Sequence, residues 1–156
     1  CIRDRAHPGH LVVGVDKSAE RLSRTGAKSF PHRDGNVLWV RAELASFWRL
    51  ALQDGWRLDR HYLLYPNPWP KPCHLKRRWH GHPVFPQLIC LGGRIEMRCN
   101  WKVYALEFAR SVSYVTGEDI GVERIYPEVG LSLFEQKYLE RGQALFSVVV
   151  RARSTA

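Results

Sequence analysis

The sequence lacks paired cysteines and long apolar runs, and both absences exclude classes of protein. Its four cysteines form no CxxC pair and show no zinc-type spacing to histidine. We therefore expect reduced thiols, no bound metal and a cytoplasmic location. No stretch approaches the roughly 20 apolar residues of a membrane span, and no signal-peptide pattern opens the chain. A soluble protein without a membrane partner is expected.

Acidic residues are also missing, from residue 60 to residue 95. The same stretch holds these cations: Arg60, Lys71, Lys76, Arg77, Arg78 and Arg94. The formal charge of +9 is uneven, because residues 1–78 hold 15 Lys/Arg against 7 Asp/Glu and residues 79–156 hold 9 against 8. A local basic surface favours a polyanionic partner, although an isolated charge run is more often a solvated face. Trp69 and Trp79 flank the cations and favour nucleic acid, since aromatic rings stack on bases.

At 156 residues and 45% hydrophobic content, the chain can bury one good core, so a single domain over residues 1–156 is expected. Strand-like segments occupy residues 11–15, 36–41, 58–64, 94–99, 122–126 and 145–151. Helical spacing covers residues 45–53 (Phe47, Leu50 and Ala51 on one side), 84–91, and 101–112 (Val103, Leu106 and Ala109 inward). Alternating strands and helices, followed by two successive strands, predict an α/β fold with a doubly wound, mostly parallel sheet and a C-terminal antiparallel hairpin.

The start of the chain is unusual for such a fold. The first apolar run, residues 11–15, is already followed by Asp16, an acidic residue of the kind that usually ends the second strand of a nucleotide-binding sheet. The pattern therefore predicts that a first strand and a glycine-rich turn are missing upstream, and two explanations stay open. Either the chain is N-terminally incomplete, or the protein lacks the usual cradle for a phosphate or carboxylate.

A proline-rich loop follows the strand-like residues 58–64 and reads YPNPWPKPCHLKRRW. Pro66, Pro68 and Pro70 each fix φ and remove an amide donor, so the segment cannot be a central strand or a helix interior. We expect a rigid extended loop. It would leave the carboxyl end of a strand, where open α/β sheets bind their ligands.

The motifs, in this order, resemble the tRNA (guanine-N7)-methyltransferase family. PNPWPKPCHLKRR resembles the family's P-D-P-W-P-K followed by H-x-K-R-R, NWKVY resembles T-D-x-x-x-Y, and SLFEQKYLERG resembles T-x-F-E followed by glycine. LGGRI before a strand supports the match, which spans nearly the whole chain. The resemblance implies a Rossmann-like methyltransferase that uses S-adenosylmethionine on tRNA or another structured RNA, as a monomer or homodimer.

The resemblance also implies cofactor-binding positions. Asp16 stands where the family has an acidic residue for the ribose hydroxyls, and Glu43 where it has one near the adenine amino group. Asn67 stands at the cofactor-binding and catalytic position of the proline loop. Two alternatives stay open: Asp16 could cap a helix together with Ser18, and Glu43 could be an exposed charge.

Catalytic and RNA-binding roles are implied for further residues. Trp69 would be a stacking platform for the base, or else a plug at the end of the sheet, with Lys71 closer to the reacting centre. The residues assigned to RNA phosphate are His74, Lys76, Arg77 and Arg78. Because neighbouring side chains point in different directions, at least one of these should pack locally or stay solvated.

Three more positions are assigned to the substrate: Asn100, Ser132 and Glu135. Ser132 could equally cap a helix. Glu135 offers two acceptor oxygens that suit the N1-H and N2 donors of guanine. Trp101 and Tyr104 are expected in the core.

Two positions depart from the family, since Asn67 and Asn100 replace aspartates. Guanine N7 has a free lone pair, so in-line methyl transfer to it needs no general base, but a neutral amide stabilises the positive purine less than a carboxylate does. Asn67-Pro68-Trp69 also resembles the Asn-Pro-Pro-aromatic loop of methyltransferases that act on exocyclic amino groups. Guanine N7 is retained because of Glu135. An exocyclic amino-group methyltransferase and a catalytically inactive RNA-binding protein remain the alternatives.

Overall fold

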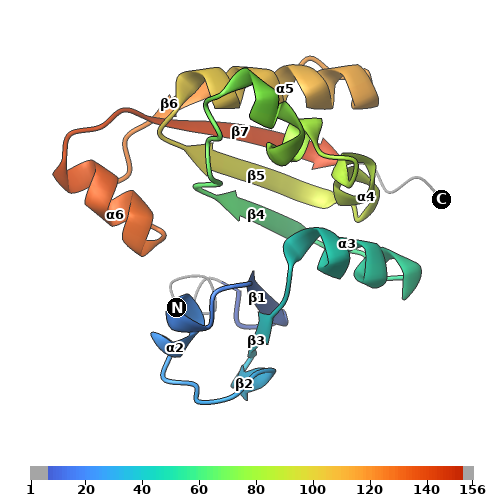
Figure 1. Ribbon diagram of the computed structural model, residues 1–156, viewed down its shortest axis with the longest axis vertical. Coiled ribbons are helices and arrows are strands. Elements are labelled where there is room, and N and C mark those ends of the chain that lie inside the picture. The colour runs from blue at the N-terminus through green and yellow to red at the C-terminus, as the bar shows by residue number, and fades with distance from the viewer. Residues whose placement is uncertain (1–6, 153–156) are drawn as a thin grey trace. The chain divides into compact units, whose positions relative to one another are not determined.

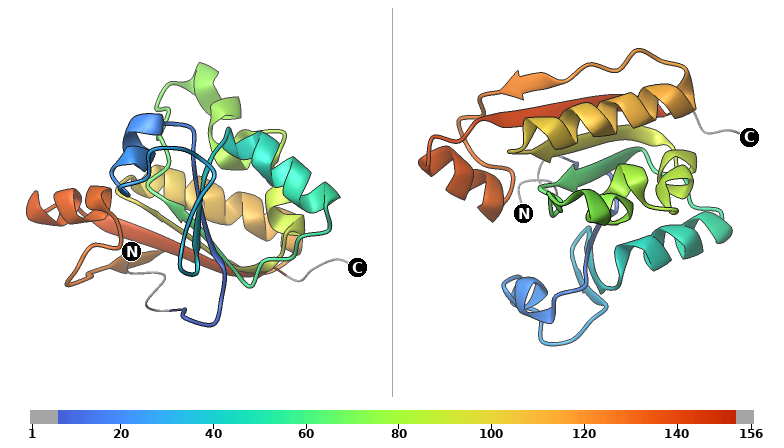
Figure 2. Two further views of the ribbon diagram at one scale, coloured as in Figure 1. Left: turned by 90° about the horizontal axis from the view of Figure 1, so that it is seen from below. Right: turned by 45° about the horizontal axis from the view of Figure 1, so that its top comes forward.

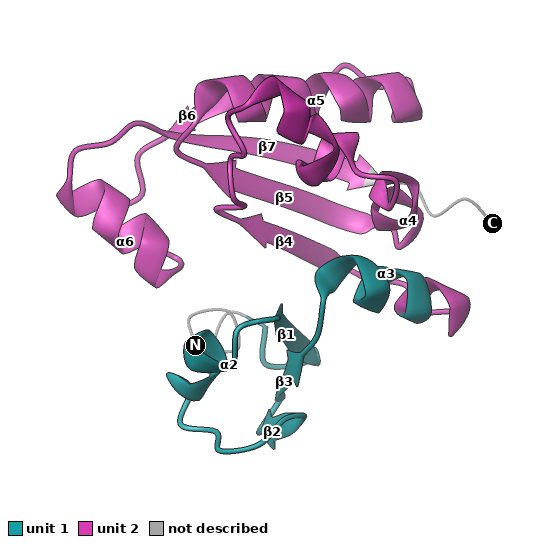
Figure 3. Cartoon of the chain, viewed as in Figure 1, with its two compact units in different colours: residues 1–50 teal, residues 51–156 magenta. Residues whose placement is uncertain are grey.

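The computed structural model describes residues 7–152, and the chain divides into two compact units, residues 1–50 and 51–156 (Figure 3). Each unit is described by itself. Both combine helices with a sheet (Figure 1), so the predicted α/β class is confirmed. The single domain over residues 1–156 and the missing upstream strand stay predictions.

The first unit is built on a three-stranded sheet of order β1-β3-β2. Strand β1 (Val12–Asp16) pairs in parallel with β3 (Val37–Arg41), and the short α2 (Ala19–Ser23) follows β1. Strand β2 (His32–Asp34) is antiparallel to β3 and was not predicted, because three polar residues carry no apolar pattern.

The second unit contains a four-stranded sheet of order β4-β5-β7-β6 (Figure 1). Its strands are β4 (Arg60–Leu64), β5 (Gly93–Cys99), β6 (Glu123–Ile125) and β7 (Leu145–Ala152). β4 and β5 are parallel, whereas β7 is antiparallel to both β5 and β6. The antiparallel C-terminal pair is as predicted, but the described strands form two mixed sheets, not one mostly parallel sheet.

The helices of this unit are short except for one. The helical elements after β4 are the 3₁₀ turns η1 (Pro72–Arg77) and η2 (Trp79–Gly81) and the helices α4 (Phe85–Cys90), α5 (Lys102–Thr116) and α6 (Leu133–Glu140). Helix α3 (Leu44–Gln53) precedes β4 and crosses the boundary between the units. Pro86 lies in the first turn of α4, as its missing N–H allows.

Helix α5 covers one face of the β5–β7 pair (Figure 2), but on a different side of the helix from the one predicted. Val103 and Leu106 are 47% and 49% exposed, while Ala109 is buried as predicted. The buried stripe contains Tyr104 and Phe108. Two apolar stripes compete on this helix, and the one with the larger aromatic surfaces is buried, since buried apolar area sets the stabilisation.

The same competition decides the buried side of α3. Trp48 is 1% exposed, with Ala45 and Ala51 buried on its side, whereas Leu50, predicted to face inward with Ala51, is 64% exposed. The largest ring therefore again defines the buried face.

Glycine is required where the chain turns into β5. Gly92 and Gly93 have φ of 75° and 76°, in the left-handed region that favours glycine. A Cβ at Gly93 would also collide with the Leu58 carbonyl oxygen. This turn brings the chain from α4 to β5 beside β4.

One partly buried histidine predicts how the stability of the fold depends on pH. Burial lowers the pKa of His61, on β4, from 6.5 to about 4. The unfolded chain therefore binds more protons than the folded chain between pH 6.5 and pH 4, and the free energy of unfolding should fall, by on the order of 2 kcal/mol, as the pH drops through that window. Urea titrations at pH 7, 5.5 and 4.5 measure it. His61→Gln should make the free energy of unfolding less dependent on pH, whereas the control His32→Gln should not. The same pH dependence in His61→Gln and wild type would contradict the assignment of this effect to His61.

Candidate functional site

The proline loop begins at the carboxyl-terminal edge of the second unit's sheet. Leu64 is paired with Arg98, and the Tyr65 N–H donates to the Arg98 carbonyl at 2.8 Å. Because β4 and β5 are parallel, the proline loop and Asn100, just after β5, leave the sheet at the same edge (Figure 1). The structure thus brings together two of the predicted segments.

The backbone of the loop is unusual at two residues. Tyr65 and Trp69 have φ of 53° and 45°, in the left-handed region. Such a conformation costs on the order of 1 kcal/mol or more for a residue with a side chain, so surrounding contacts must hold it. Asn67 is exposed, and its Oδ1 accepts a 3.4 Å hydrogen bond from the Trp69 N–H, which makes a local turn.

The Trp69 ring is partly covered by its own neighbours. The Arg77 guanidinium carbon lies over the ring, 4.8 Å from its centroid, and the His74 ring meets it edge-on at 5.3 Å. Lys71, Lys76 and Arg77 are exposed. The loop therefore presents an aromatic ring in the middle of solvent-facing cations, the arrangement expected for stacking and phosphate contact.

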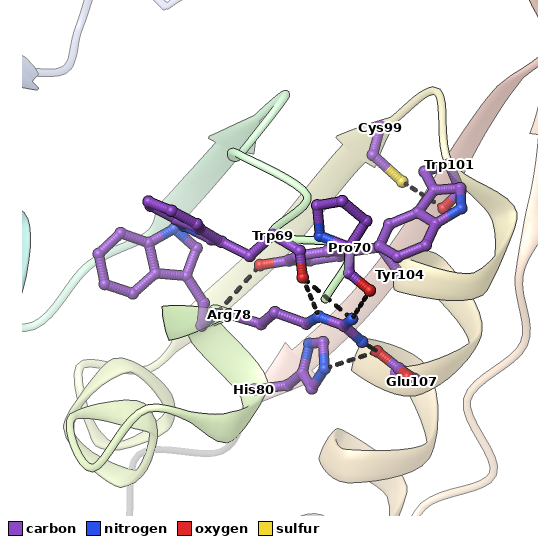
Figure 4. A network of polar contacts seen from close by, with 9 residues as sticks. Trp69, Pro70, Arg78, His80, Cys99, Trp101, Tyr104 and Glu107 are labelled. Carbon is purple, nitrogen blue, oxygen red and sulfur yellow. Dashed lines mark hydrogen bonds and ion pairs between the residues drawn. The ribbon is translucent and has the colours of Figure 1, made fainter. Parts of the chain in front are cut away.

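Arg78 differs from its neighbours because it is 5% exposed. Its Nε and Nη2 donate to the Trp69 carbonyl at 3.1 and 3.0 Å, and Nη2 also lies 3.3 Å from the Pro70 carbonyl (Figure 4). Its Nη1 forms an ion pair with Glu107. These contacts argue against the predicted phosphate contact of Arg78, which is the member of the cationic run that packs locally.

A second set of buried contacts ties the end of the loop to α5 (Figure 4). The Trp79 N–H donates to the Tyr104 hydroxyl at 3.0 Å, and His80 Nε2 lies 3.1 Å from Glu107 Oε2. Burial raises the pKa of Tyr104, so its hydroxyl stays protonated. Burial lowers the pKa of His80, although the Glu107 carboxylate opposes the shift. Tyr104 lies in the core as predicted; the role of Glu107 was not predicted.

The described part of the second unit also contains a cavity of about 360 Å³. It is lined by His80, Phe85, Arg110, Ser111, Tyr114 and Val115. None of the predicted site residues lines it.

Glu135 is fully buried, which argues against its predicted contact with the Watson-Crick edge of guanine. Its Oε1 pairs with Arg98 Nη1 at 2.8 Å, and its Oε2 accepts from the Leu131 N–H at 2.8 Å. Arg98 also pairs with Glu96 at 2.7 Å. Both carboxylate oxygens are thus used inside the protein, where they join α6 to β5.

Other contacts hold α6 beside the same edge of the sheet. The Tyr65 and Tyr138 rings lie 5.3 Å apart, and Asn100 Nδ2 donates to Gln143 Oε1 at 2.9 Å. Ser132 caps α6, its hydroxyl oxygen accepting from the Glu135 N–H at 3.2 Å. The capping alternative for Ser132 is therefore the one observed.

In the first unit, the two acidic candidates follow the two parallel strands. Asp16 ends β1, its Oδ1 accepting from the Ser18 N–H at 2.8 Å and its Oδ2 pairing with Arg21 at 3.1 Å. Glu43 is exposed, follows β3 and caps α3 by accepting from the Ser46 N–H at 2.9 Å. Both lie at the carboxyl ends of paired parallel strands. The N-cap of α2 is Ser18, to whose N–H Asp16 is bonded, and Glu43 is the exposed charge that its alternative predicted.

The remaining features concern metals, thiols and membranes. Cys73, Cys90 and Cys99 are free thiols, and Cys1 lies outside the described residues. Across residues 7–152, no three metal-binding side chains gather in one place. No helix within that range combines the length and apolar character needed to cross a membrane.

Comparison with known families decides the wider relationship. The family model described as "Putative methyltransferase" matches residues 4–147. The chain belongs to this family. The methyltransferase relationship predicted from the motifs is thereby confirmed.

Individual members named as tRNA (guanine-N(7)-)-methyltransferases are similar to the chain. That of Nitrosospira multiformis is 30% identical over 106 residues, covering 64% of this chain and 46% of that protein. Those of Aquifex aeolicus and Nitrosomonas europaea are 25% and 26% identical, covering 89% and 93% of this chain and 45% and 67% of those proteins. The chain spans about half the length of the first two.

Solved methyltransferase structures share the fold. An antibiotic-related methyltransferase has a TM-score of 0.56 at 17% identity and covers 96% of this chain and 80% of that one. A methyltransferase solved as a complex with SAH has a TM-score of 0.51 at 13% identity, over 93% of this chain and 40% of that one. At these identities the likeness concerns fold, and it supports the predicted Rossmann-like methyltransferase type.

Proposed function

We propose that the protein methylates guanine N7 in tRNA, with S-adenosylmethionine as the methyl donor. The observation that carries the proposal is the proline loop, which places Asn67 and Trp69 among exposed cations at the carboxyl-terminal edge of a methyltransferase-type sheet. The names of the similar curated proteins support the same reaction.

The reaction is an in-line displacement. The N7 lone pair forms a bond to the sulfonium methyl carbon while the carbon–sulfur bond breaks, so the positive charge passes from sulfur to the purine. No proton is lost, and the loop has to orient the base rather than supply a general base. In this proposal Asn67 presents its amide to the reacting base, Trp69 stacks, and Lys71 stays near the reacting centre.

Asp16 fits the proposed binding of the cofactor ribose. Its partner Arg21 has a 51% exposed side chain, and an exposed ion pair contributes little stability and exchanges readily. A carboxylate held at the end of β1 by the Ser18 N–H can therefore accept from two hydroxyls. Glu43 keeps its proposed place near the adenine amino group, and its exposed side chain allows the contact.

The exposed cations predict the salt dependence of tRNA binding. In the proposal Lys76 and Arg77 contact phosphates, together with His74. Lys76→Ala and Arg77→Ala should each weaken binding for all tRNA sequences and reduce the slope of log K against log salt by about one. Filter binding between 50 and 200 mM salt measures the slopes. Arg110→Ala, an exposed change on α5, is the control; a slope unchanged in both loop variants would contradict the phosphate contacts.

Transfer to an exocyclic amino group is the second candidate, and the burial of Glu135 favours it. The Watson-Crick contact assigned to Glu135 was the argument for guanine N7 over an amino group, and the carboxylate is bonded to Arg98 instead. Asn67 could accept from an amino group through its Oδ1. The names of the similar proteins leave N7 as the preferred atom.

The test is methyl transfer by the full-length protein from tritium-labelled S-adenosylmethionine to bulk tRNA, followed by nucleoside mass spectrometry. We expect 7-methylguanosine. Labelled N2-methylguanosine or N6-methyladenosine would select the amino-group reading. No incorporation, together with no cofactor binding in calorimetry but retained tRNA binding, would select an inactive RNA-binding protein. The cytoplasmic location and the monomeric or dimeric state remain predictions.

A further inference from the structure

We propose that Arg78 is a positioning residue of the methyl-transfer site. It holds the proline loop by hydrogen bonds from its buried guanidinium and does not contact RNA. The inference rests on the proposed function for its catalytic meaning. It goes beyond that function by separating one arginine of the basic run from its exposed neighbours.

The loop needs an external donor because of its own composition. Pro66, Pro68 and Pro70 have no N–H, so the loop has few donors to satisfy its carbonyl groups. Arg78 supplies them, with two hydrogen bonds to the Trp69 carbonyl and one to the Pro70 carbonyl. The guanidinium thus stabilises the left-handed conformation of Trp69.

The guanidinium is itself fixed on its other sides. Glu107 on α5 pairs with Nη1, and the guanidinium carbon lies 5.1 Å from the centroid of the Trp101 ring. His80 bonds the same carboxylate oxygen. Helix α5 is therefore connected through one buried side chain to Trp69 and Pro70, which follow Asn67 by two and three residues.

Lysine cannot replace this arrangement. Arginine presents a planar fork of five N–H donors, whereas lysine presents one compact ammonium group. The Arg78→Lys variant keeps the charge but loses the simultaneous contacts with Trp69, Pro70 and Glu107. Since methyl transfer depends on alignment, a small shift of the loop should slow turnover.

The experiment compares Arg78→Lys with Arg77→Lys, Arg77→Ala and the control Arg110→Lys in the full-length protein. For Arg78→Lys we expect kcat to fall about 10- to 100-fold, with KM for tRNA and the salt slope unchanged. Arg77→Ala should raise KM and lower the slope by about one, with Arg77→Lys partly restoring both. A lower salt slope with unchanged kcat in Arg78→Lys would identify a phosphate contact and overturn the proposal. Unchanged kcat, KM and salt slope in Arg78→Lys would overturn it as well.

Two further measurements keep the proposal testable. Glu107→Gln removes the ion pair but keeps an acceptor, so kcat should fall in the same direction by a smaller factor even if Arg78→Lys folds poorly. Limited trypsin cleavage after Lys76 and Arg77 should be faster in Arg78→Lys than in wild type. This measurement does not require methyl-transfer activity. If wild type transfers no methyl group, the proposed function fails, and the cleavage rates alone decide whether Arg78 holds the loop.

Discussion

Replacing Asn67 by alanine is expected to lower the rate of methyl transfer by about 100-fold while tRNA affinity changes by less than about threefold. The side chain is exposed at the carboxyl-terminal edge of the sheet, and its Oδ1 bonds the Trp69 N–H. Its loss would remove both the amide that is proposed to face the base and the bond that makes the local turn. Single-turnover rates and filter binding measure the two quantities.

The matched variant is Asn67→Asp, which keeps the acceptor oxygen and adds charge. For N7 transfer it should be at least as active as wild type, because a carboxylate stabilises the positive purine better than an amide. Asn67→Ala with wild-type turnover, or with a loss of affinity equal to that of Lys76→Ala, would contradict the division between catalytic and phosphate-binding residues.

Much of the fold could be predicted because its strands are short apolar runs bounded by Gly, Pro or charged residues. The parallel strands β1, β3, β4 and β5 were predicted in this way to within one or two residues. The inward face of α5 was not, because the two apolar stripes of the helix have the same 3.6-residue period. Which stripe is buried depends on the sheet beneath, where Tyr104 and Phe108 fit against β5 and β7.

The sequence predicted which segment forms the candidate site, but it did not predict which residue of that segment makes which contact. Arg77 and Arg78 are adjacent and chemically identical, yet one lies over Trp69 and the other is buried behind it. Arg78 is set apart by its bonds to the Trp69 and Pro70 carbonyls and to Glu107, almost thirty residues later. The ion pairs of Glu96 with Arg94 and Arg98 could have been predicted from the sequence. These three charges alternate with apolar residues, and residues two apart on a strand share one face.

Glu135→Ala is expected to lower the free energy of unfolding by about 3 kcal/mol, because it removes one of the two carboxylate partners of the partly buried Arg98 guanidinium and leaves the Leu131 N–H without its acceptor. The carboxylate is fully buried between Arg98 and the start of α6. Urea unfolding monitored by tryptophan fluorescence measures the change. Glu140→Ala, at the exposed end of the same helix, is the control, with an expected change within about 0.5 kcal/mol.

The double variant Arg98→Met/Glu135→Leu separates the cost of leaving one charge unpaired from the net contribution of the ion pair to stability. It should recover a large part of the lost stability, because apolar side chains of similar size replace both charges and Glu96 keeps Arg94 as its partner. Equal stability of Glu135→Ala and Glu140→Ala would show that the pair does not hold α6 to the sheet. A Glu135→Gln variant with unchanged stability but weaker tRNA binding would instead return Glu135 to guanine recognition. The burial of the side chain argues for the first role, since a fully buried carboxylate bonded to Arg98 and Leu131 is not accessible to a base.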